Sequence, residues 1–586
     1  MRFNNQRLPA HRATLGQARQ LLARTRSSSA LLLAVALAGP AAAGELPEGD
    51  PEAGQRFYRE GLNRNGETVP VQVQGDIQAT SNQFTCVGCH RPSGFGSSEG
   101  GEFVPFITSD VLFSDRDATQ QRRNRQFREL FKETHSSDFD AQVKMPRMRP
   151  AYTRETLARA IRGGVDSAGE ELSETMPRYQ ISDQTAADLI AYLKTLSTED
   201  DPGVSDDILH IGTVIGSEVG DERRRAVVQT MRLFVEWYNK DIQGQLEHEG
   251  FSPFYRSEFK DSFRKWKLHV WDLDGPPSTW RNQLEARYAD KKVFAMVSGL
   301  VDERWEPVAD FCDAQRLPCV FPNTQLPRTE DATYNYSIYF SRGLELEGEA
   351  LAVHLGNQEQ TTNSVQQVHV SSDAGRVPAR AFSRQATDEM PDTTVTTRKA
   401  ADRAELKSAI ADAANEGGML AIWPGADVQV ALKALNQNAD ALDQVFLPSA
   451  ALDPARANAS NALTGKLRFT YPNEKPEGYH PRQYRVRAWM HSRGLEVSHS
   501  RIQLQTYYAL TQMQYGVSHL ISDFNRDYLI EFIEKEAEAE LNPGTHPKLA
   551  LGPGQRFASK GAYVMALETD SDGETGYKAV SDWIVP

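Results

Sequence analysis

The sequence predicts an exported multidomain protein in which a small all-α domain precedes a two-lobed α/β domain. Three observations lead to this prediction. The chain opens with an arginine-rich and then apolar segment, a Cys-x-x-Cys-His motif follows at residues 86–90, and beyond residue 207 apolar strand-like runs alternate with amphipathic helices. At 586 residues the chain can hold several domains of about 150 residues each.

Residues 1–43 are predicted to be a signal peptide that is cleaved near Ala43. Six arginines and no acidic residue form its basic start, residues 30–38 form a short apolar core, and three alanines precede the cut. An uncleaved anchor and a mitochondrial-type presequence are the alternatives, but the cysteine motif favours export to the periplasm. The apolar core is too short to span a bilayer comfortably, and no later segment is apolar enough, so we expect no stable membrane insertion.

The mature chain is predicted to be acidic. Without the signal peptide, 59 basic residues face 79 acidic ones, which gives a net charge of −20. Binding to phosphate groups depends on excess Lys and Arg, so this charge disfavours nucleic acid and anionic membrane surfaces as partners.

The motif Cys86-Val87-Gly88-Cys89-His90 is the signature of c-type haem attachment. Two thiols on one helical turn can each form a thioether to a haem vinyl group, and the adjacent histidine can bind the iron from the proximal side. A disulfide or half of a zinc site is the alternative, but no second cysteine pair lies nearby to complete a zinc site. We therefore predict one haem c, covalently attached to Cys86 and Cys89, with His90 as an iron ligand.

Residues 150–196 are predicted to complete the small domain. A short helix carries Leu157, Ala160 and Ile161 on one face and stops at a pair of glycines. A polar loop then delivers Met176 and Pro177, and Ser182 caps a final helix. Methionine is the usual sixth ligand of an electron-transferring haem c, and the proline stiffens the backbone after the sulfur.

In this order of elements, residues 50–200 resemble a class I cytochrome c domain, with a helix at 52–60, the cysteine motif, a Met-Pro loop and a C-terminal helix ending in AYLKTL. The resemblance implies His90 and Met176 as the axial ligands. His135, Met145 and Met148 are rivals, because they lie in a long insertion between His90 and Pro150. The position of Met176 before the last helix favours it. We place this domain at 44–200 and an acidic linker at 201–207.

The rest of the chain, residues 208–586, is predicted to form parallel sheets covered by helices. Its apolar runs lie at 208–215, 268–273, 293–298, 318–321, 365–370, 419–423 and 445–448, with helical stretches between most of them. Such alternation is typical of α/β layers, and the length exceeds that of one typical domain, which predicts two lobes.

This region resembles the type I periplasmic binding proteins of the branched-chain amino acid receptor family. The resemblance rests on order and pattern in IGTVIGSEVGDERR, VFAMVSGLVDERWEPVADFCDAQRLPCVFPNT, YSIYFSRGLELEGEALA, HVSSDAGRVPARAF and LGPGQRFASKGAYVM. It implies two lobes joined by crossovers, one of them near 336–342, that enclose a cleft for a small solute.

The resemblance also implies a set of cleft residues, for which we consider Asp302, Thr324, Ser341 and Asp373. Family members commonly hold a ligand carboxylate with a Ser or Thr at the tip of the third strand, whereas this chain has Asp302 and Glu303 there. Like charge disfavours a carboxylate, so the sequence favours a cation, an amine or a neutral solute. Alternatively, Asp302 caps a helix that begins at Glu303.

Cys312 and Cys319 form a second pair, at the end of one predicted helix and the start of the next strand. Export to an oxidising compartment favours a disulfide between them, and buried free thiols or a redox pair are the alternatives.

These features predict an electron carrier that exchanges electrons with a periplasmic redox protein or dehydrogenase and uses the larger domain for docking or sensing. The alternative is a haem-containing solute receptor of the type that serves ABC transporters. An enzyme is less favoured, because a haem with two axial protein ligands has no open site for a substrate. No hydrolase, metalloprotease or phosphate-loop motif stands out elsewhere in the chain.

Overall fold

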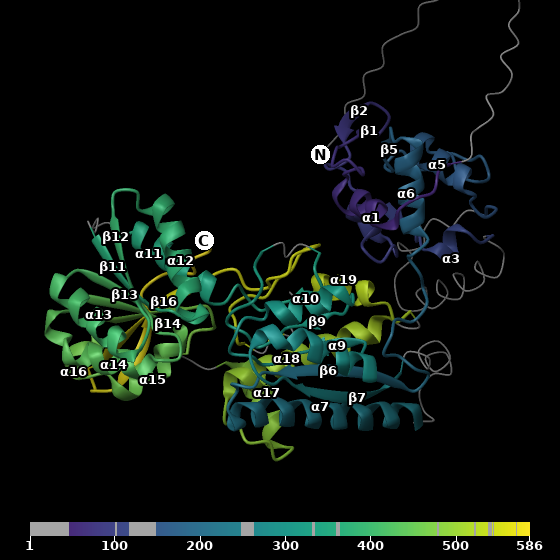
Figure 1. Cartoon of the computed structure of the whole chain (residues 1–586). Coiled ribbons are helices and arrows are strands. Elements are labelled where there is room, and N and C mark those ends of the chain that lie inside the picture. The colour runs from purple at the N-terminus through teal and green to yellow at the C-terminus, as the bar shows by residue number, and fades with distance from the viewer. Residues whose placement is uncertain are drawn as a thin grey trace, which may run out of the picture. The chain divides into compact units, whose positions relative to one another are not determined.

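The computed structural model describes residues 46–99, 102–115, 148–247, 263–330, 334–358, 364–476, 480–520, 523–536, 542, 544–569 and 571–586. The predicted signal peptide with its cut near Ala43, and the rival ligands His135 and Met145, lie outside these residues. Leu46–Pro586 form one unit, in which a small N-terminal domain is followed by two α/β lobes (Figure 1).

The helices of the small domain lie close to where the sequence predicts, except for α3, which was not predicted. They are α1 (Pro51–Glu60), α2 (Cys86–His90), α3 (Ser109–Leu112), α5 (Arg154–Gly163) and α6 (Asp183–Leu193). The side chain of Ser182 accepts a hydrogen bond from the Thr185 amide and caps α6, as predicted. At the end of α5, Gly164 has a φ of 68° and its amide bonds to Ala160, which confirms the predicted stop.

The prediction of an all-α small domain is wrong in one respect, because this domain also contains a sheet. Strands β1 (Pro70–Val73), β2 (Ile77–Thr80) and β5 (Arg178–Tyr179) form an antiparallel sheet in the order β2-β1-β5, and β3 (Ser97–Glu99) pairs with β4 (Glu102–Val104). The strands are short, and only part of β1 is buried, so they lack a long apolar alternation by which a sequence reveals a strand.

The first and last helices of the small domain cross closely. A side chain at Gly54 of α1 would meet the Asp188 carbonyl oxygen of α6 at 2.0 Å, so only glycine permits this approach. Next to the crossing, the rings of Tyr58 and Tyr192 lie 5.2 Å apart. The crossing thus holds together segments that lie on either side of the haem motif in sequence.

Lobe 1 is built on a parallel sheet with the strand order β10-β9-β8-β6-β7, as predicted for a helix-covered α/β layer. Its strands are β6 (Ile208–Ile215), β7 (Lys265–Asp272), β8 (Ala295–Val297), β9 (Cys319–Val320) and β10 (Ser337–Ile338). Its helices are α7 (Asp221–Glu247), α9 (Trp280–Asp290), α10 (Glu306–Ala314), α17 (Pro481–His491), α18 (Ser500–Leu520) and α19 (Arg526–Glu536). The last three helices return to lobe 1 before the chain adds the last two strands of lobe 2, and α18 and α19 supply part of the core of lobe 1.

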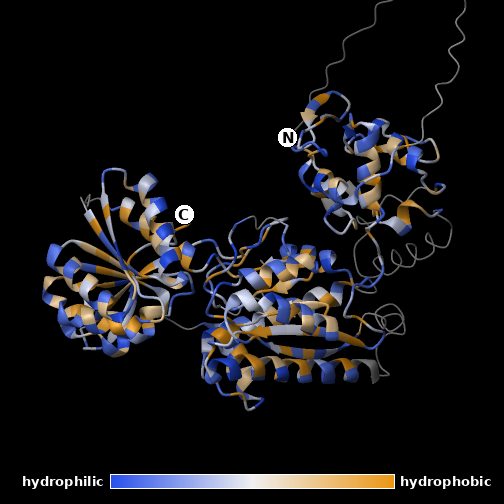
Figure 2. Ribbon diagram, in the orientation of Figure 1, coloured by the Kyte–Doolittle hydropathy of each residue, from blue (hydrophilic) through white to orange (hydrophobic). Residues whose placement is uncertain are grey.

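Lobe 2 contains a sheet with the order β12-β11-β13-β14-β15-β16-β17, in which the last two strands run antiparallel to their neighbours. The strands are β11 (Ser364–Val370), β12 (Thr394–Ala400), β13 (Met419–Trp423), β14 (Gln444–Pro448), β15 (Leu467–Tyr471), β16 (Tyr563–Thr569) and β17 (Thr575–Ala579). The helices are α11 (Leu344–Gly356), α12 (Asp373–Glu389), α13 (Arg403–Glu416), α14 (Val428–Gln437), α15 (Leu452–Asn458) and α16 (Asn461–Thr464). Separate apolar clusters cover its two faces, and apolar residues gather on its strands in Figure 2.

The two-lobed α/β prediction is therefore confirmed, and the predicted crossover near 336–342 corresponds to the step from β10 to α11. Among the described residues, no helix combines the length and the apolar character that crossing a membrane requires.

The linker predicted at 201–207 is fixed to lobe 1. The buried side chain of Arg526 donates hydrogen bonds to the carbonyl oxygens of Pro202 at 2.8 Å and Val293 at 2.7 Å. The carboxylate of Asp201 accepts a bond from the Arg526 amide at 2.7 Å. The small domain thus continues into lobe 1 through an anchored segment.

Candidate functional site

The haem motif forms a short helix whose end is wrapped by the following loop. Helix α2 contains both cysteines and His90. A turn that contains Gly94 and Gly96 follows it. The Gly96 amide donates to the His90 carbonyl oxygen at 3.1 Å, and a side chain on Gly96 would meet the Val104 carbonyl oxygen at 2.1 Å. Gly96 therefore lets the residues after α2 turn back onto the end of that helix.

His90 is held in the form that binds a metal. Its Nδ1 lies 3.1 Å from the carbonyl oxygen of Pro105, and because a carbonyl only accepts, Nδ1 carries the hydrogen. The lone pair then resides on Nε2. Burial lowers the pKa of His90 to about 4, although the bond to Pro105 opposes this shift, so the ring is neutral at pH 7. A neutral imidazole fixed through Nδ1 is the usual arrangement of a histidine ligand.

The two cysteines of α2 differ in environment, and neither is in a disulfide. Cys86 is partly buried, and burial raises its pKa to about 12 despite a hydrogen bond with Tyr179. The Tyr179 hydroxyl also donates to the Phe84 carbonyl oxygen at 2.7 Å. Two thiols and an imidazole with a free lone pair on one turn are the donor set that c-type haem requires, and these residues fit it.

The loop with Met176 is tied down close to this helix. Met176 precedes Tyr179 by three residues, so the bond from Tyr179 to Phe84 brings the loop to the start of α2. The guanidinium of Arg178 donates to the carbonyl oxygens of Leu172 at 3.0 Å and Ser173 at 3.2 Å, and also to that of Met176. Arg178 shapes the loop, a role that its sequence context does not indicate.

Gly164 is a further residue that the sequence gives no reason to single out as part of the site. A side chain there would lie 1.9 Å from Nε of Arg178, so the glycine leaves the space in which Arg178 reaches the loop. The helix-stop signal at this position was visible in the sequence, but the contact with Arg178 depends on the fold.

The assignment of Met176 as the sixth ligand stays a prediction. Met176 is partly buried, as an iron ligand in a small domain should be. The rival Met148 is 50% exposed, which disfavours it.

The predicted cleft residues of lobe 1 bind their neighbours. The carboxylate of Asp302 forms two bonds of 2.7 Å with the guanidinium of Arg223. It does not cap a helix, since α10 begins only at Glu306. Thr324 Oγ1 accepts from the Leu326 amide and Ser341 Oγ from the Gly343 amide, both at 3.1 Å.

The loops of Thr324 and Ser341 do come together, because the Leu344 amide donates to the Gln325 carbonyl oxygen at 2.9 Å. Asp373 instead begins α12 in lobe 2 and pairs with Arg376. Since Arg223 balances the charge of Asp302, the reason to expect a cationic solute is weakened.

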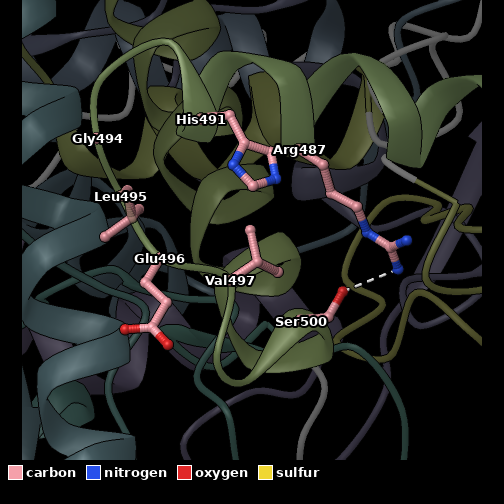
Figure 3. A pocket seen from close by; sticks show the side chains of 7 residues that line it. All are labelled: Arg487, His491, Gly494, Leu495, Glu496, Val497 and Ser500. Carbon is pink, nitrogen blue, oxygen red and sulfur yellow. Dashed lines mark hydrogen bonds between the residues drawn. The ribbon is translucent and has the colours of Figure 1, made fainter.

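Two adjoining cavities lie elsewhere. One, of about 730 Å³, is lined by Arg487, His491, Ser500 and residues 494–497, and in Figure 3 Arg487 reaches Ser500, at 3.0 Å. The other, of about 530 Å³, lies where β14 and β15 end and shares Arg487 and Ser500. None of the four predicted cleft residues lines either cavity.

The second cavity is lined by side chains of both charges as well as by apolar ones. Arg501, Lys475 and two histidines stand against Asp453 and Glu474. Beside it, the fully buried carboxylate of Glu347 accepts bonds from Ser449 Oγ at 2.6 Å and Thr470 Oγ1 at 2.9 Å. These bonds fix the cavity wall at the end of β14. Glu347 lies about 100 residues before Ser449, so the sequence does not reveal this contact.

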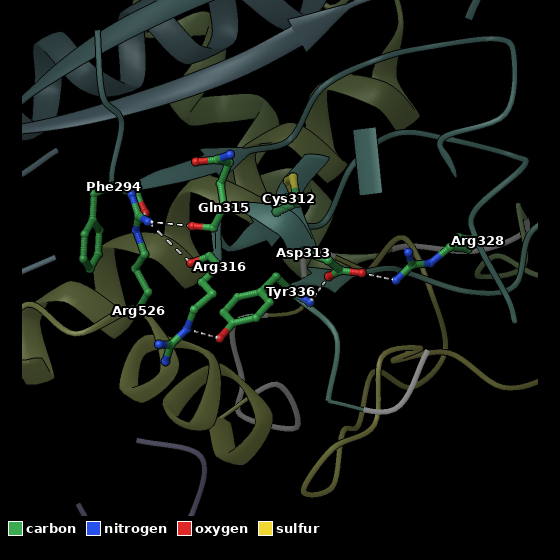
Figure 4. The surroundings of a disulfide bond; sticks show 9 residues. Phe294, Cys312, Asp313, Gln315, Arg316, Arg328, Tyr336 and Arg526 are labelled. Atoms are coloured by element: carbon green, nitrogen blue, oxygen red, sulfur yellow. Dashed lines mark hydrogen bonds and ion pairs between the residues drawn. A yellow bond between two sulfur atoms is a disulfide. The ribbon is translucent and has the colours of Figure 1, made fainter. Parts of the chain in front are cut away.

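Cys312 and Cys319 are joined by a disulfide in the interior of lobe 1, with their Cα atoms 6.5 Å apart. The bond closes the turn from α10 to β9, and Figure 4 shows the Arg316 side chain leaving this turn toward Tyr336, to which it is bonded at 3.0 Å. Among the described residues, no group of three or more His, Cys, Asp or Glu side chains is arranged to hold a metal ion.

In comparisons with known proteins, no family model and no curated protein matches the chain. Solved structures do. A fatty acid ABC transporter substrate-binding protein from Thermomonospora curvata is 13% identical with a TM-score of 0.49, over 66% of this chain and 95% of that one. A solute-binding protein from Rhodopseudomonas palustris BisB5, in complex with 3,4-dihydroxybenzoic acid, is 13% identical with a TM-score of 0.48, over 65% and 98%.

A branched-chain amino acid ABC transporter protein from Thermus thermophilus with bound valine is 11% identical with a TM-score of 0.48, again over 65% and 98%. The two-lobed fold itself is defined by the strand orders of its two sheets.

Proposed function

We propose that this chain is a periplasmic haem c protein whose two-lobed domain receives a small solute. The observation that carries the haem part is the bond from His90 Nδ1 to Pro105, which leaves the Nε2 lone pair on the same turn as two cysteines. Cys86 and Cys89 would hold the porphyrin, and His90 and Met176 would bind the iron. The group would supply one-electron oxidation and reduction.

The solute part of the proposal is supported by the two lobes, and by a cavity of about 530 Å³ at the strand ends of lobe 2 that is lined by side chains of both charges and by apolar ones. Ligand sites of open α/β sheets lie at the carboxyl ends of the strands, where this cavity lies. The substrate-binding proteins with similar structures are named as ABC-transporter components, in keeping with a receptor that delivers its solute to a transporter.

Electron transfer is the second candidate function, and Met176 is the residue that favours it. A His/Met pair leaves no open iron position for a substrate and suits a carrier that exchanges electrons with a periplasmic dehydrogenase or another redox protein. In that case the two-lobed domain docks the redox partner.

The haem proposal is tested with protein matured in a host that attaches haem c. We expect pigment that resists extraction into acidified organic solvent, and in the oxidised form the absorption band of methionine-ligated haem. Colourless protein would contradict the haem, and a high-spin spectrum would contradict Met176 as ligand.

The solute proposal is tested by a thermal-shift screen of small carboxylates, amines and neutral compounds. A solute at 100 times its Kd should stabilise the protein by about 2.7 kcal/mol. Substitution Arg501→Ala in the second cavity should abolish the shift, and Arg376→Ala on α12, outside it, should not. If no solute shifts the melting and a redox protein co-purifies, the electron-carrier function is favoured.

A further inference from the structure

One side of α19 in lobe 1 carries three acidic side chains that face the small domain. Asp527, Glu531 and Glu534 are spaced by four and three residues, which places them on one helix face. Asp527 and Glu534 are buried and Glu531 is partly buried. Acidic side chains are seldom buried without partners, so each of these three requires a hydrogen-bonding or positively charged partner within the chain.

The partner of Glu531 is Ser93, three residues after the haem-binding histidine. The Ser93 amide lies 2.7 Å from one carboxylate oxygen, and the Ser93 hydroxyl lies 2.9 Å from the other. Ser93 is 1% exposed. Two residues on, the ring of Phe95 packs at 4.9 Å from that of Tyr528 on α19. These contacts connect the loop after α2 with lobe 1.

Asp527 is bound by two groups of lobe 1 and also feels the charge of a cation in the small domain. The Tyr336 hydroxyl donates to it at 2.7 Å and the Arg316 guanidinium at 2.5 Å, both from lobe 1. Arg59, on α1 of the small domain, adds its charge: burial works against the charged form of Asp527, but Arg316 and Arg59 outweigh it and lower the pKa of Asp527. Figure 4 shows Arg316 and Tyr336 side by side.

Glu534 is the third acid of the face. Arg556 donates to it at 2.5 Å and the Gly554 amide at 3.0 Å. Burial raises the pKa of Glu534 above its usual value, although the charges of Arg556 and Arg91 oppose this shift. Arg91 directly follows His90 and belongs to the same loop as Ser93. Its carbonyl oxygen accepts from the buried Tyr58 hydroxyl at 2.6 Å, which fixes the loop to α1.

We propose that the acidic face of α19 is the docking surface for the haem segment, residues 86–96, and that haem attachment strengthens this docking. The inference rests on the proposed haem function. The conformation of the segment depends on His90, whose carbonyl oxygen binds the Gly96 amide and whose ring binds Pro105. A group bonded to Cys86, Cys89 and His90 fixes the helix from which the loop starts.

The coupling is reciprocal. A group that binds only the ordered segment stabilises every contact made by that segment, and the contacts with α19 in turn favour the bound group. The state of the haem site is thereby communicated to lobe 1, which gives the fusion of the two domains a physical purpose.

The test is hydrogen exchange by mass spectrometry on the full mature chain. We compare peptides that cover 526–536 in haem-loaded wild type, in a haem-free Cys86→Ser/Cys89→Ser variant, and in haem-loaded Ser93→Ala and Glu531→Ala variants. We expect about tenfold faster exchange of α19 in all three variants, with α14 in lobe 2 unchanged as an internal reference.

The matched control is Lys535→Ala, because Lys535 is exposed on the same helix and makes none of these contacts. It should exchange like wild type. Equal α19 exchange in haem-loaded and haem-free protein would overturn the coupling, and wild-type exchange in both Ser93→Ala and Glu531→Ala would overturn the docking surface. If wild type carries no haem, the proposed function fails, while the Ser93 and Glu531 variants still decide the docking surface.

Discussion

The haem segment and the strand ends predicted to form a cleft use their polar side chains in opposite ways. In the haem segment, Nδ1 of His90 is bonded to Pro105 and Nε2 keeps its lone pair. At the strand ends, both carboxylate oxygens of Asp302 are bonded to Arg223, and the hydroxyls of Thr324 and Ser341 accept from amides two residues on. The residue types suit ligand binding in both regions, but only in the first does a bond to one atom of a side chain fix the lone pair of another atom.

This difference explains why one prediction from sequence was specific and the other was not. A ligand motif within five consecutive residues fixes its own geometry, because a single helical turn brings the side chains together. The cleft depends on four loops from two lobes, and its polar atoms find other partners once the chain has folded.

The largest expected effect concerns the two cysteines of the haem segment. Replacing Cys86→Ser and Cys89→Ser would remove both proposed thioethers, so all pigment should be lost when the protein is extracted with acidified organic solvent. The absorbance of the protein pellet measures the pigment that remains attached after extraction. The matched pair Cys312→Ser and Cys319→Ser, buried in lobe 1, should keep the pigment. Pigment retained in the first variant would show that the motif does not attach it.

The next effect concerns the loop that carries Met176. Gly164→Ala places a side chain against Arg178 at a φ of 68°, so the variant should lose about 2 kcal/mol of the free energy of unfolding, from backbone strain and lost loop bonds. Denaturant unfolding of the small domain measures this. Gly163→Ala, with no atom within 4 Å of the added carbon, should be neutral or slightly stabilising. Equal stabilities would remove Arg178 as an organiser of the loop.

The fold, like the site, is predicted well from the sequence only where the contacts are local. Helix α6 is correctly predicted from the Ser182 cap, and β6 and β13 occupy the residues expected of them. The sheet β2-β1-β5 was missed, because β5 has two residues and pairs with a strand about 100 positions earlier. The acidic face of α19 was missed for the same reason: its partner Ser93 is 438 residues away.

A smaller effect is expected from pH. Burial raises the pKa of Glu531 well above its usual value, with Asp527 and Glu534 as acidic neighbours and Tyr58 facing it from α1, whereas the pKa of Asp527 is lowered. The contribution of Glu531 to docking is present at acidic pH and is lost as the pH rises through its raised pKa. The contribution of Asp527 is present above about pH 4 and is lost as the pH falls through its lowered pKa.

Docking should therefore be strongest between these two pKa values, and exchange of α19, corrected for intrinsic rates, should accelerate several-fold on either side. Glu531→Gln keeps the shape of the side chain and removes the ionisation, so it should reduce the loss at higher pH, to which the raised pKa of Glu534 also contributes, and leave the loss at lower pH unchanged. A wild-type profile that is flat across the range would contradict a titrating interface.

The smallest effect tests the cleft side of the comparison. Asp302 and Arg223 are 39% and 34% exposed, so Asp302→Asn should cost less than about 1 kcal/mol in the free energy of unfolding. Asp272→Asn, in the similarly exposed pair with Arg224, should cost about as much. If Asp302 served only this ion pair, any solute found by thermal shift would stabilise both variants as it does wild type. A shift lost in Asp302→Asn alone would return this carboxylate to the solute site, and with it the expectation of a cationic ligand that the bond to Arg223 now weakens.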